Sequence, residues 1–238
     1  MINLGVLKKR LDLATLLELR FEGSDGSQVF ADSSSYNRSV TVSSGSPALS
    51  TTNPLAGTAS LLLGTNGTIT TPDFGVSVFN YIRTIEFRIQ TALTDIAANE
   101  SQGVFIKGFS SSFFQDYSHQ CILTRNASGN GGVLKLYLKI PNSSTPASVL
   151  GVTIPDLSQN NHIAFTHRTN GTYAAYLNGT LANTLFSANY TQNSLAIELG
   201  CSVYNWDTGL QTNKFKGRLD NFRLSNVDRY PNNFTPPA

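Results

Sequence analysis

Short segments in which apolar and polar residues alternate recur along this chain, and each is followed by a cluster of Gly, Asn, Pro or Ser. In segment 134–140, Leu or Ile occupies every second position, with Lys or Tyr between. Since successive side chains of a strand point to opposite sides, this pattern places an aliphatic face against a core. The recurrence predicts an all-β fold of about twelve to fourteen strands, arranged as a two-sheet antiparallel sandwich.

Hairpins are predicted at three of the Asn-Gly pairs that lie between apolar segments, namely Asn66-Gly67, Asn170-Gly171 and Asn178-Gly179. Both residue types tolerate positive φ, so each pair can close a tight hairpin without strain. The segment 168–172 is the clearest case, because it joins two strongly apolar runs. We therefore expect a hairpin at each pair.

The first fourteen residues follow a different pattern, since their Leu residues recur at helical spacing and basic residues occupy the other faces. A helix of this length is marginal on its own and needs a surface to pack on. It either folds onto its own sandwich or serves as an assembly arm that docks on a partner. The predicted boundaries are 1–14 for the arm and 15–238 for the sandwich. The candidate arm residues are Leu4, Leu7, Lys8, Lys9, Arg10 and Leu11.

Charge is sparse in this chain and nearly balanced. Only 13% of its 238 residues are charged, and 17 basic against 15 acidic side chains leave a formal charge of +2. Nucleic-acid binding normally requires a basic excess, so no nucleic-acid partner is expected. Basic residues interrupt the amino-terminal apolar run before it reaches the length of a signal peptide core. No later run approaches the ~18 apolar residues of a membrane span, so no membrane association is expected.

Three blocks of sequence resemble the concanavalin A-like, laminin-G-type jelly-roll domains of tailed-bacteriophage virion proteins. The first block is 17–45, the second combines 59–74 with 83–90, and the third combines 162–184, 195–200 and 215–237. The most specific part is the closing segment GRLDNFRL of residues 217–224, followed by Arg229-Tyr230 and by the FTPP run of residues 234–237. This chain departs from many relatives at Asn178-Gly179, where they have Asp-Gly, and residues 1–14 lie outside the usual domain.

The resemblance implies a jelly roll whose first and last strands lie together and whose acidic residue in the closing strand, Asp220, fixes a neighbouring loop. It also implies a non-enzymatic structural protein displayed on a virion, made in the host cytoplasm. A capsid decoration protein or a small tail-associated module suits the length of the chain. Its partners would be other capsid or tail proteins, in a homo-oligomer or symmetric assembly.

Catalytic and metal-binding patterns are weak in this sequence. Glu86 is the carboxylate placed most like a glycosidase residue, but neither position i+2 nor i+4 carries a second carboxylate, and Arg88 stands at i+2. His162 and His167 point to opposite faces of one strand, and His119 has no nucleophile motif near it. We expect no enzyme activity and no catalytic residue.

No cofactor or metal site is expected either, although Ca²⁺ stays open. Calcium binds about six to eight oxygen ligands, and the aspartates of this chain show no clustered spacing that would supply them. Cys121 and Cys201 fit no metal spacing, and they are either two buried thiols or a disulfide.

Glycan binding is the alternative function. The only Trp lies in a loop beside amide and carboxylate groups that can hydrogen-bond to sugars, and loops at sandwich ends commonly carry function. The alternative is a structural role. In that case the aromatic residues of this loop, and of a second loop around residue 117, cap the core or fill a subunit interface. The candidate glycan-binding residues are Tyr204, Asn205, Trp206, Asp207 and Tyr117.

Overall fold

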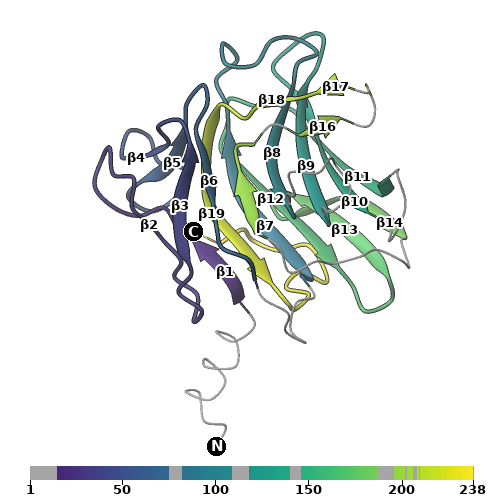
Figure 1. Cartoon of the computed structure of the whole chain (residues 1–238). Helices are drawn as coiled ribbons and strands as arrows, with labels where there is room; N and C mark the ends of the chain where they lie inside the picture. The colour runs from purple at the N-terminus through teal and green to yellow at the C-terminus, as the bar shows by residue number, and fades with distance from the viewer. Residues whose placement is uncertain are drawn as a thin grey trace, which may run out of the picture.

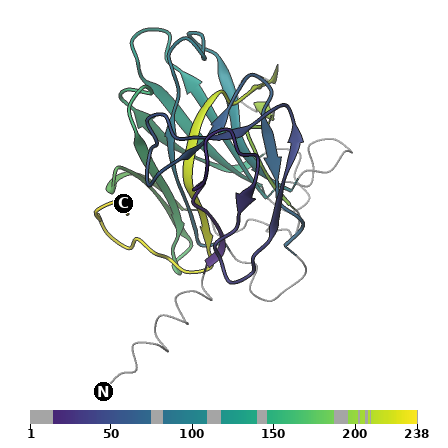
Figure 2. The ribbon, with the colours of Figure 1, turned by 90° about the vertical axis from the view of Figure 1, so that its left-hand side faces the viewer.

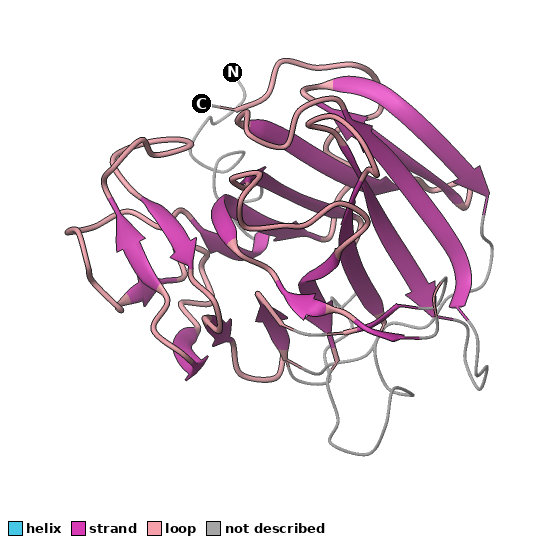
Figure 3. Cartoon of the chain, turned by 90° about the horizontal axis from the view of Figure 1, so that it is seen from above, coloured by secondary structure: helices cyan, strands magenta, loops and turns pink. Residues whose placement is uncertain are grey.

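The structure is a computed structural model that describes residues 15–74, 82–108, 118–139, 146–186, 196–201, 203–205, 208 and 210–237. In the described part the chain forms two facing sheets, whose layers are visible from the side and from above (Figure 1; Figure 3). All described strand pairs are antiparallel except the parallel pair of β18 and β8. The predicted two-sheet antiparallel jelly-roll sandwich is confirmed.

Sheet I contains eight strands. Their order is β14 (Thr180–Phe186), β13 (Thr172–Leu177), β12 (Asn161–His167), β7 (Thr84–Gln90), β19 (Gly217–Ser225), β5 (Ser60–Leu63) and β4 (Ala48–Ser50), with β1 (Thr15–Leu19) also paired to β19. Strands β1 and β5 both pair with β19, β1 along its second half and β5 along its first half. The first and last strands therefore lie together, as the family resemblance implied.

Sheet II contains nine strands. Their order is β11 (Pro146–Ile154), β10 (Gly132–Lys139), β9 (His119–Arg125), β8 (Ser101–Lys107), β15 (Ile197–Leu199), β6 (Thr68–Thr70), β3 (Ser39–Ser44) and β2 (Phe30–Ala31), with β18 (Asn213–Lys214) beside β8. A separate two-stranded hairpin pairs β16 (Tyr204–Asn205) with β17 (Leu210–Gln211).

The core between the sheets is built from the alternating apolar positions of both. At its centre Phe87 of β7, Phe105 of β8 and Phe222 of β19 are fully buried, with ring centroids 5.5–5.9 Å apart. Such offset and edge-to-face contacts stabilise aromatic pairs beyond the area they bury. Because Phe105 comes from sheet II and the other two from sheet I, the cluster joins the layers.

The strand count is higher than predicted. Nineteen strands are described instead of twelve to fourteen, but seven of them have only two or three residues. Strands this short carry no readable alternation, and without them twelve remain. The aliphatic face of segment 134–140 is confirmed, since Leu134, Leu136 and Leu138 are buried. Tyr137 on the opposite face is also buried, because the outer side of sheet II has its own apolar cluster.

Two of the three predicted hairpins are confirmed, and one is wrong. Asn178-Gly179 joins β13 to β14 with both residues at positive φ, and residues 168–171 join β12 to β13. Asn66-Gly67, in contrast, connects β5 of sheet I to β6 of sheet II. Asn-Gly chemistry selects a local turn but not the partner of the strand that follows, so the same dipeptide serves here as a crossing between sheets.

Asp220 ties the closing strand to the loop before β5, as the resemblance implied. Its carboxylate accepts hydrogen bonds from the Ala56 backbone N–H at 2.9 Å, the Ser60 hydroxyl at 2.7 Å and the Asn221 N–H at 2.8 Å. Burial nevertheless raises the pKa of Asp220 to about 6. The loop is thereby fixed by a fully buried carboxyl group.

The tail after β19 folds back over the outer face of sheet I (Figure 2). Cys121 and Cys201 are buried free thiols, so the disulfide alternative is wrong. The predicted arm, including Leu4, Leu7, Lys8, Lys9, Arg10 and Leu11, lies outside the described residues. In the part of the chain that is described, no helix is long and apolar enough to cross a membrane.

Candidate functional site

The predicted glycan-binding loop is only partly described. Tyr204 and Asn205 form β16, whereas Trp206, Asp207 and Tyr117 lie outside the described residues, as does the side chain of Tyr204. Asn205 is buried, not exposed to a ligand, and its side-chain amide donates to the Ser101 hydroxyl at 3.1 Å. This amide anchors the hairpin to β8, and the sugar contact of Asn205 stays a prediction.

Further bonds hold the base of the same hairpin. The Val203 N–H donates to the Thr212 hydroxyl at 3.0 Å, and the Thr212 N–H donates to the Val203 carbonyl at 2.7 Å. Both residues are buried. The two strands that flank Trp206 and Asp207 in the sequence are thus fixed on sheet II.

A second polar feature is a charged row across the outer face of sheet I. Glu18 of β1 lies opposite Arg223 of β19, and Arg223 lies opposite Glu86 of β7. Each of these residues stands between two core residues of its own strand, so all three project away from the core. Arg223 Nη1 lies 4.0 Å from a carboxylate oxygen of each glutamate.

Glu86 is the buried centre of this row. Tyr230 donates its hydroxyl to Glu86 Oε2, His162 Nε2 lies 3.5 Å from the same oxygen, and Arg229 Nε lies 3.0 Å from Oε1. Burial alone would raise the pKa of Glu86, but these polar neighbours, with Arg223, outweigh burial and hold the pKa below its ordinary value. Glu86 is therefore an ionised carboxylate at neutral pH.

The carboxy-terminal tail completes the surroundings of Glu86. The rings of Tyr230 and Phe234 stack with centroids 3.6 Å apart. Both residues pack on Tyr176 and on the small side chain of Ala164. Ala164 is the cross-strand neighbour of Glu86. Tyr176 donates its hydroxyl to the Tyr230 carbonyl at 2.7 Å. Burial and the Glu86 carboxylate raise the pKa of Tyr230 to about 12, so its hydroxyl remains a donor.

An open pocket of about 480 Å³ lies over the charged row. We call it the sheet I pocket. Its buried floor includes Glu86 and His162, and its sides include Glu18, Arg20, Glu22 and Arg223. The volume is within the roughly 300–1,000 Å³ of small-molecule sites.

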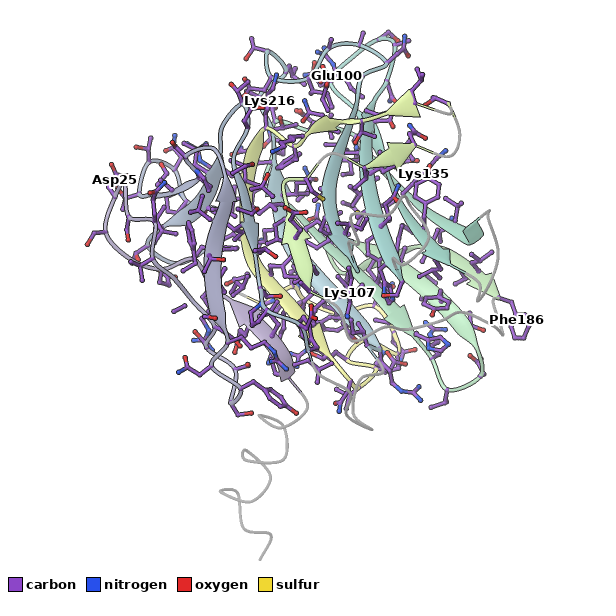
Figure 4. The ribbon with its side chains drawn as sticks, in the orientation of Figure 1. Asp25, Glu100, Lys107, Lys135, Phe186 and Lys216 are labelled. Carbon is purple, nitrogen blue, oxygen red and sulfur yellow. The ribbon has the colours of Figure 1, made fainter. Side chains whose placement is uncertain are left out.

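The other histidines are structural. His167 stacks on Tyr173 at 4.3 Å, and His119 is buried with its pKa lowered to about 3, chiefly by burial. Buried Lys107 of β8, labelled in Figure 4, lies opposite His119 of β9, and burial lowers its pKa to about 8. Among the residues that the structure describes, no group of three or more His, Cys, Asp or Glu could hold a metal ion.

The sequence reasoning missed the sheet I pocket. Alternation within each strand is consistent with Glu18, Glu86 and Arg223 on the faces opposite the core, but nothing local indicates that their three strands are neighbours. The implied proximity of the first and last strands is the one signal from which a contact between Glu18 and Arg223 could have been inferred.

This geometry defines a class of protein: a two-sheet jelly-roll sandwich, closed by pairing of its first and last strands, with polar sites on its outer faces. The family is equally clear. Residues 63–232 match the laminin G type family described as "Concanavalin A-like lectin/glucanases superfamily". The match spans more than half of the chain, which therefore belongs to this family. No curated protein matches the chain.

Solved structures show the same fold at low sequence identity. The receptor-binding domain of botulinum neurotoxin C/D mosaic serotype is similar with a TM-score of 0.62 at 11% identity, over 91% of this chain and 49% of that one. The serotype D ligand-binding domain in complex with N-acetylneuraminic acid gives 0.64 at 12% identity, over 91% and 48%. This chain thus spans about half the length of the toxin domains. Domain 4 of an extracellular arabinanase from Geobacillus stearothermophilus, in complex with arabinotriose, gives 0.57 at 19% identity, over 89% and 91%.

Proposed function

We propose that this chain is a non-catalytic carbohydrate-binding module whose glycan contact is the loop of Trp206 and Asp207. One observation carries the proposal: the hairpin that flanks this loop is fixed to sheet II by the buried Asn205 amide and by the bonds between Val203 and Thr212. Strands that are fixed before binding lose less conformational entropy when a ligand binds between them. The sugar ligands of the structurally similar domains are consistent with this function.

A non-catalytic role is supported by the state of the carboxyl groups. Glycoside hydrolysis needs a proton donor whose pKa is raised, beside a second carboxylate. Glu86 has a lowered pKa, so it is not such a donor. Asp220 has a raised pKa, but it is fully buried beneath the loop that it holds.

Replacing Trp206 with alanine is expected to weaken glycan binding about two- to tenfold, because an aromatic contact contributes roughly 0.5–1.5 kcal/mol. A glycan array that compares wild type with Trp206→Ala measures this. Phe186→Ala is the matched control, because Phe186 is an aromatic residue of β14 that projects into solvent and is 69% exposed (Figure 4). Absence of glycan binding by the wild type would remove the proposal.

We further propose that the module is displayed on a tailed-phage virion, as a capsid decoration or small tail-associated protein. The support is the sequence resemblance, whose most specific segment, residues 217–237, supplies the closing strand and the tail that folds over sheet I. In this proposal residues 1–14 dock on other virion proteins.

Deleting residues 1–14 is expected to abolish attachment to particles, since the docking segment is removed while the sandwich core is kept. The measurement is the occupancy of the truncated chain on purified particles, seen by imaging. Circular dichroism of the free truncated chain is the control for folding. Full occupancy without residues 1–14 would contradict the arm.

A further inference from the structure

The sheet I pocket exists because β19 changes neighbours along its length. Strand β1 ends at Leu19 and β5 reaches only the first half of β19, so the outer face has a gap between them. The register of β19 against β7 shifts between Asp220 and Arg223, and Asn221 there has φ 47°. Such a bulge redirects side chains, and bulges are frequent beside functional sites.

The loop before β5 holds a third carboxylate at the pocket, that of Glu22 in the segment after β1. Glu22 Oε2 accepts from the Thr58 N–H at 2.9 Å, and this requires a glycine at position 57. A Cβ on Gly57 would lie 1.6 Å from Glu22 Oε1, and its φ of +55° also disfavours other residues. The sequence and the bulge together thus place acceptors and donors around one space.

Charges of both signs line the pocket without being fully paired by hydrogen bonds. Arg223 Nη1 is 4.0 Å from both Glu18 and Glu86, beyond the length of a hydrogen bond. Arg20 donates to Glu18 at 3.1 Å, but its side chain is 57% exposed. A hydroxyl group between these side chains could accept from a guanidinium and donate to a carboxylate.

We propose that the sheet I pocket is a second ligand site, for a neutral sugar unit with adjacent hydroxyl groups. The site adds to the proposed carbohydrate-binding function and does not use the loop of Trp206. An anionic ligand would meet Glu18, Glu22 and Glu86, and a cationic ligand would meet Arg20 and Arg223. A polyhydroxylated neutral ligand satisfies both sets, because each hydroxyl is both donor and acceptor.

Titrations followed by ligand-observed NMR test the site. The probes are the methyl glycosides of glucose, galactose, mannose and arabinose, with glucuronic acid and glucosamine as charged counterparts. We expect a neutral glycoside to bind and the charged sugars to bind at least about tenfold more weakly, since like charges repel. Arg20→Gln and Glu22→Gln, two exposed side chains at the mouth, are each expected to weaken binding about tenfold.

Two controls separate this site from the loop. Arg218 lies on the same strand as Arg223 but does not line the pocket, so Arg218→Gln should bind as wild type does. Trp206→Ala should also retain binding of the neutral glycoside. Loss of binding in Trp206→Ala alone overturns the second site and leaves the proposed function standing. Failure of every neutral glycoside to bind, or tighter binding of a charged sugar, also overturns it, and the glycan array then decides the proposed function separately.

Discussion

Replacing Phe222 with alanine is expected to lower the free energy of unfolding by about 3–5 kcal/mol. Phe222 is fully buried and contacts both Phe87 and Phe105, at centroid distances of 5.8 Å and 5.5 Å. The substitution leaves a cavity at the junction of the two sheets, and tightly paired strands around it cannot collapse to fill it. Urea denaturation followed by intrinsic fluorescence measures the change.

Phe186→Ala is the matched control for this experiment, because the Phe186 side chain is 69% exposed. Its effect should stay within about 0.5 kcal/mol, as for most surface substitutions. A loss below about 1 kcal/mol for Phe222→Ala would contradict a core centred on the three phenylalanines, because a buried Phe→Ala change costs several kcal/mol.

Replacing Glu86 with alanine is expected to cost about 3–5 kcal/mol, because removing one partner of a buried ion pair leaves the other charge uncompensated. Arg229 would lose the carboxylate at 3.0 Å, and Tyr230 would lose the acceptor of its hydroxyl. Tyr230→Phe removes only the hydroxyl and should cost about 1.5–3 kcal/mol, the range for hydrogen bonds to charged groups. The measurement is again the free energy of unfolding.

The pH dependence of Glu86 has a definite sign. Its pKa is lower in the folded chain than its ordinary value of 4.5, so the unfolded chain binds the proton first as the pH falls. The stability that Glu86 contributes is therefore present above about pH 4.5 and is lost as the pH falls through the folded pKa. Glu86→Gln lacks this contribution, and its stability should fall less steeply below that pH.

His119 also contributes to the pH dependence of stability in the acid range, and its contribution must be distinguished from that of Glu86. The pKa of His119 is about 3 in the folded chain, below its ordinary value of 6.5. The unfolded chain therefore binds this proton first, and the folded chain loses stability through His119 as the pH falls below about 6.5. The difference between wild type and Glu86→Gln cancels the His119 contribution. Equal acid slopes for the two proteins would contradict the assignment of a lowered pKa to Glu86.

The fold was largely predictable because its signal is local. The Leu134, Leu136 and Leu138 alternation records a buried face in three successive strand positions, whatever the strand pairs with. Turn chemistry at Asn178-Gly179 is equally local. The same reasoning failed at Asn66-Gly67, because the choice between a hairpin and a crossing to the other sheet depends on packing energies between distant segments.

For the candidate sites too, local features could be read from the sequence, whereas contacts between distant segments could not. The sequence located the only Trp beside polar groups, but it did not indicate that the Asn205 amide is a buried anchor to β8. In the sequence Glu86 stood out as the carboxylate placed most like a glycosidase residue, but its own strand carries no second carboxylate. The residues that surround Glu86 come instead from β12, β19 and the tail, more than seventy positions away.

By itself the sequence determined the class of fold, because period-two alternation can bury only one face of each strand and a sandwich satisfies that requirement. It also determined that the closing strand and tail resemble those of one family. Only the tertiary structure decided that Glu18, Arg223 and Glu86 form one row under an open pocket. The reason is physical: strand order is set by long-range pairing and core packing, and side chains on an outer face acquire their neighbours only when that order is fixed.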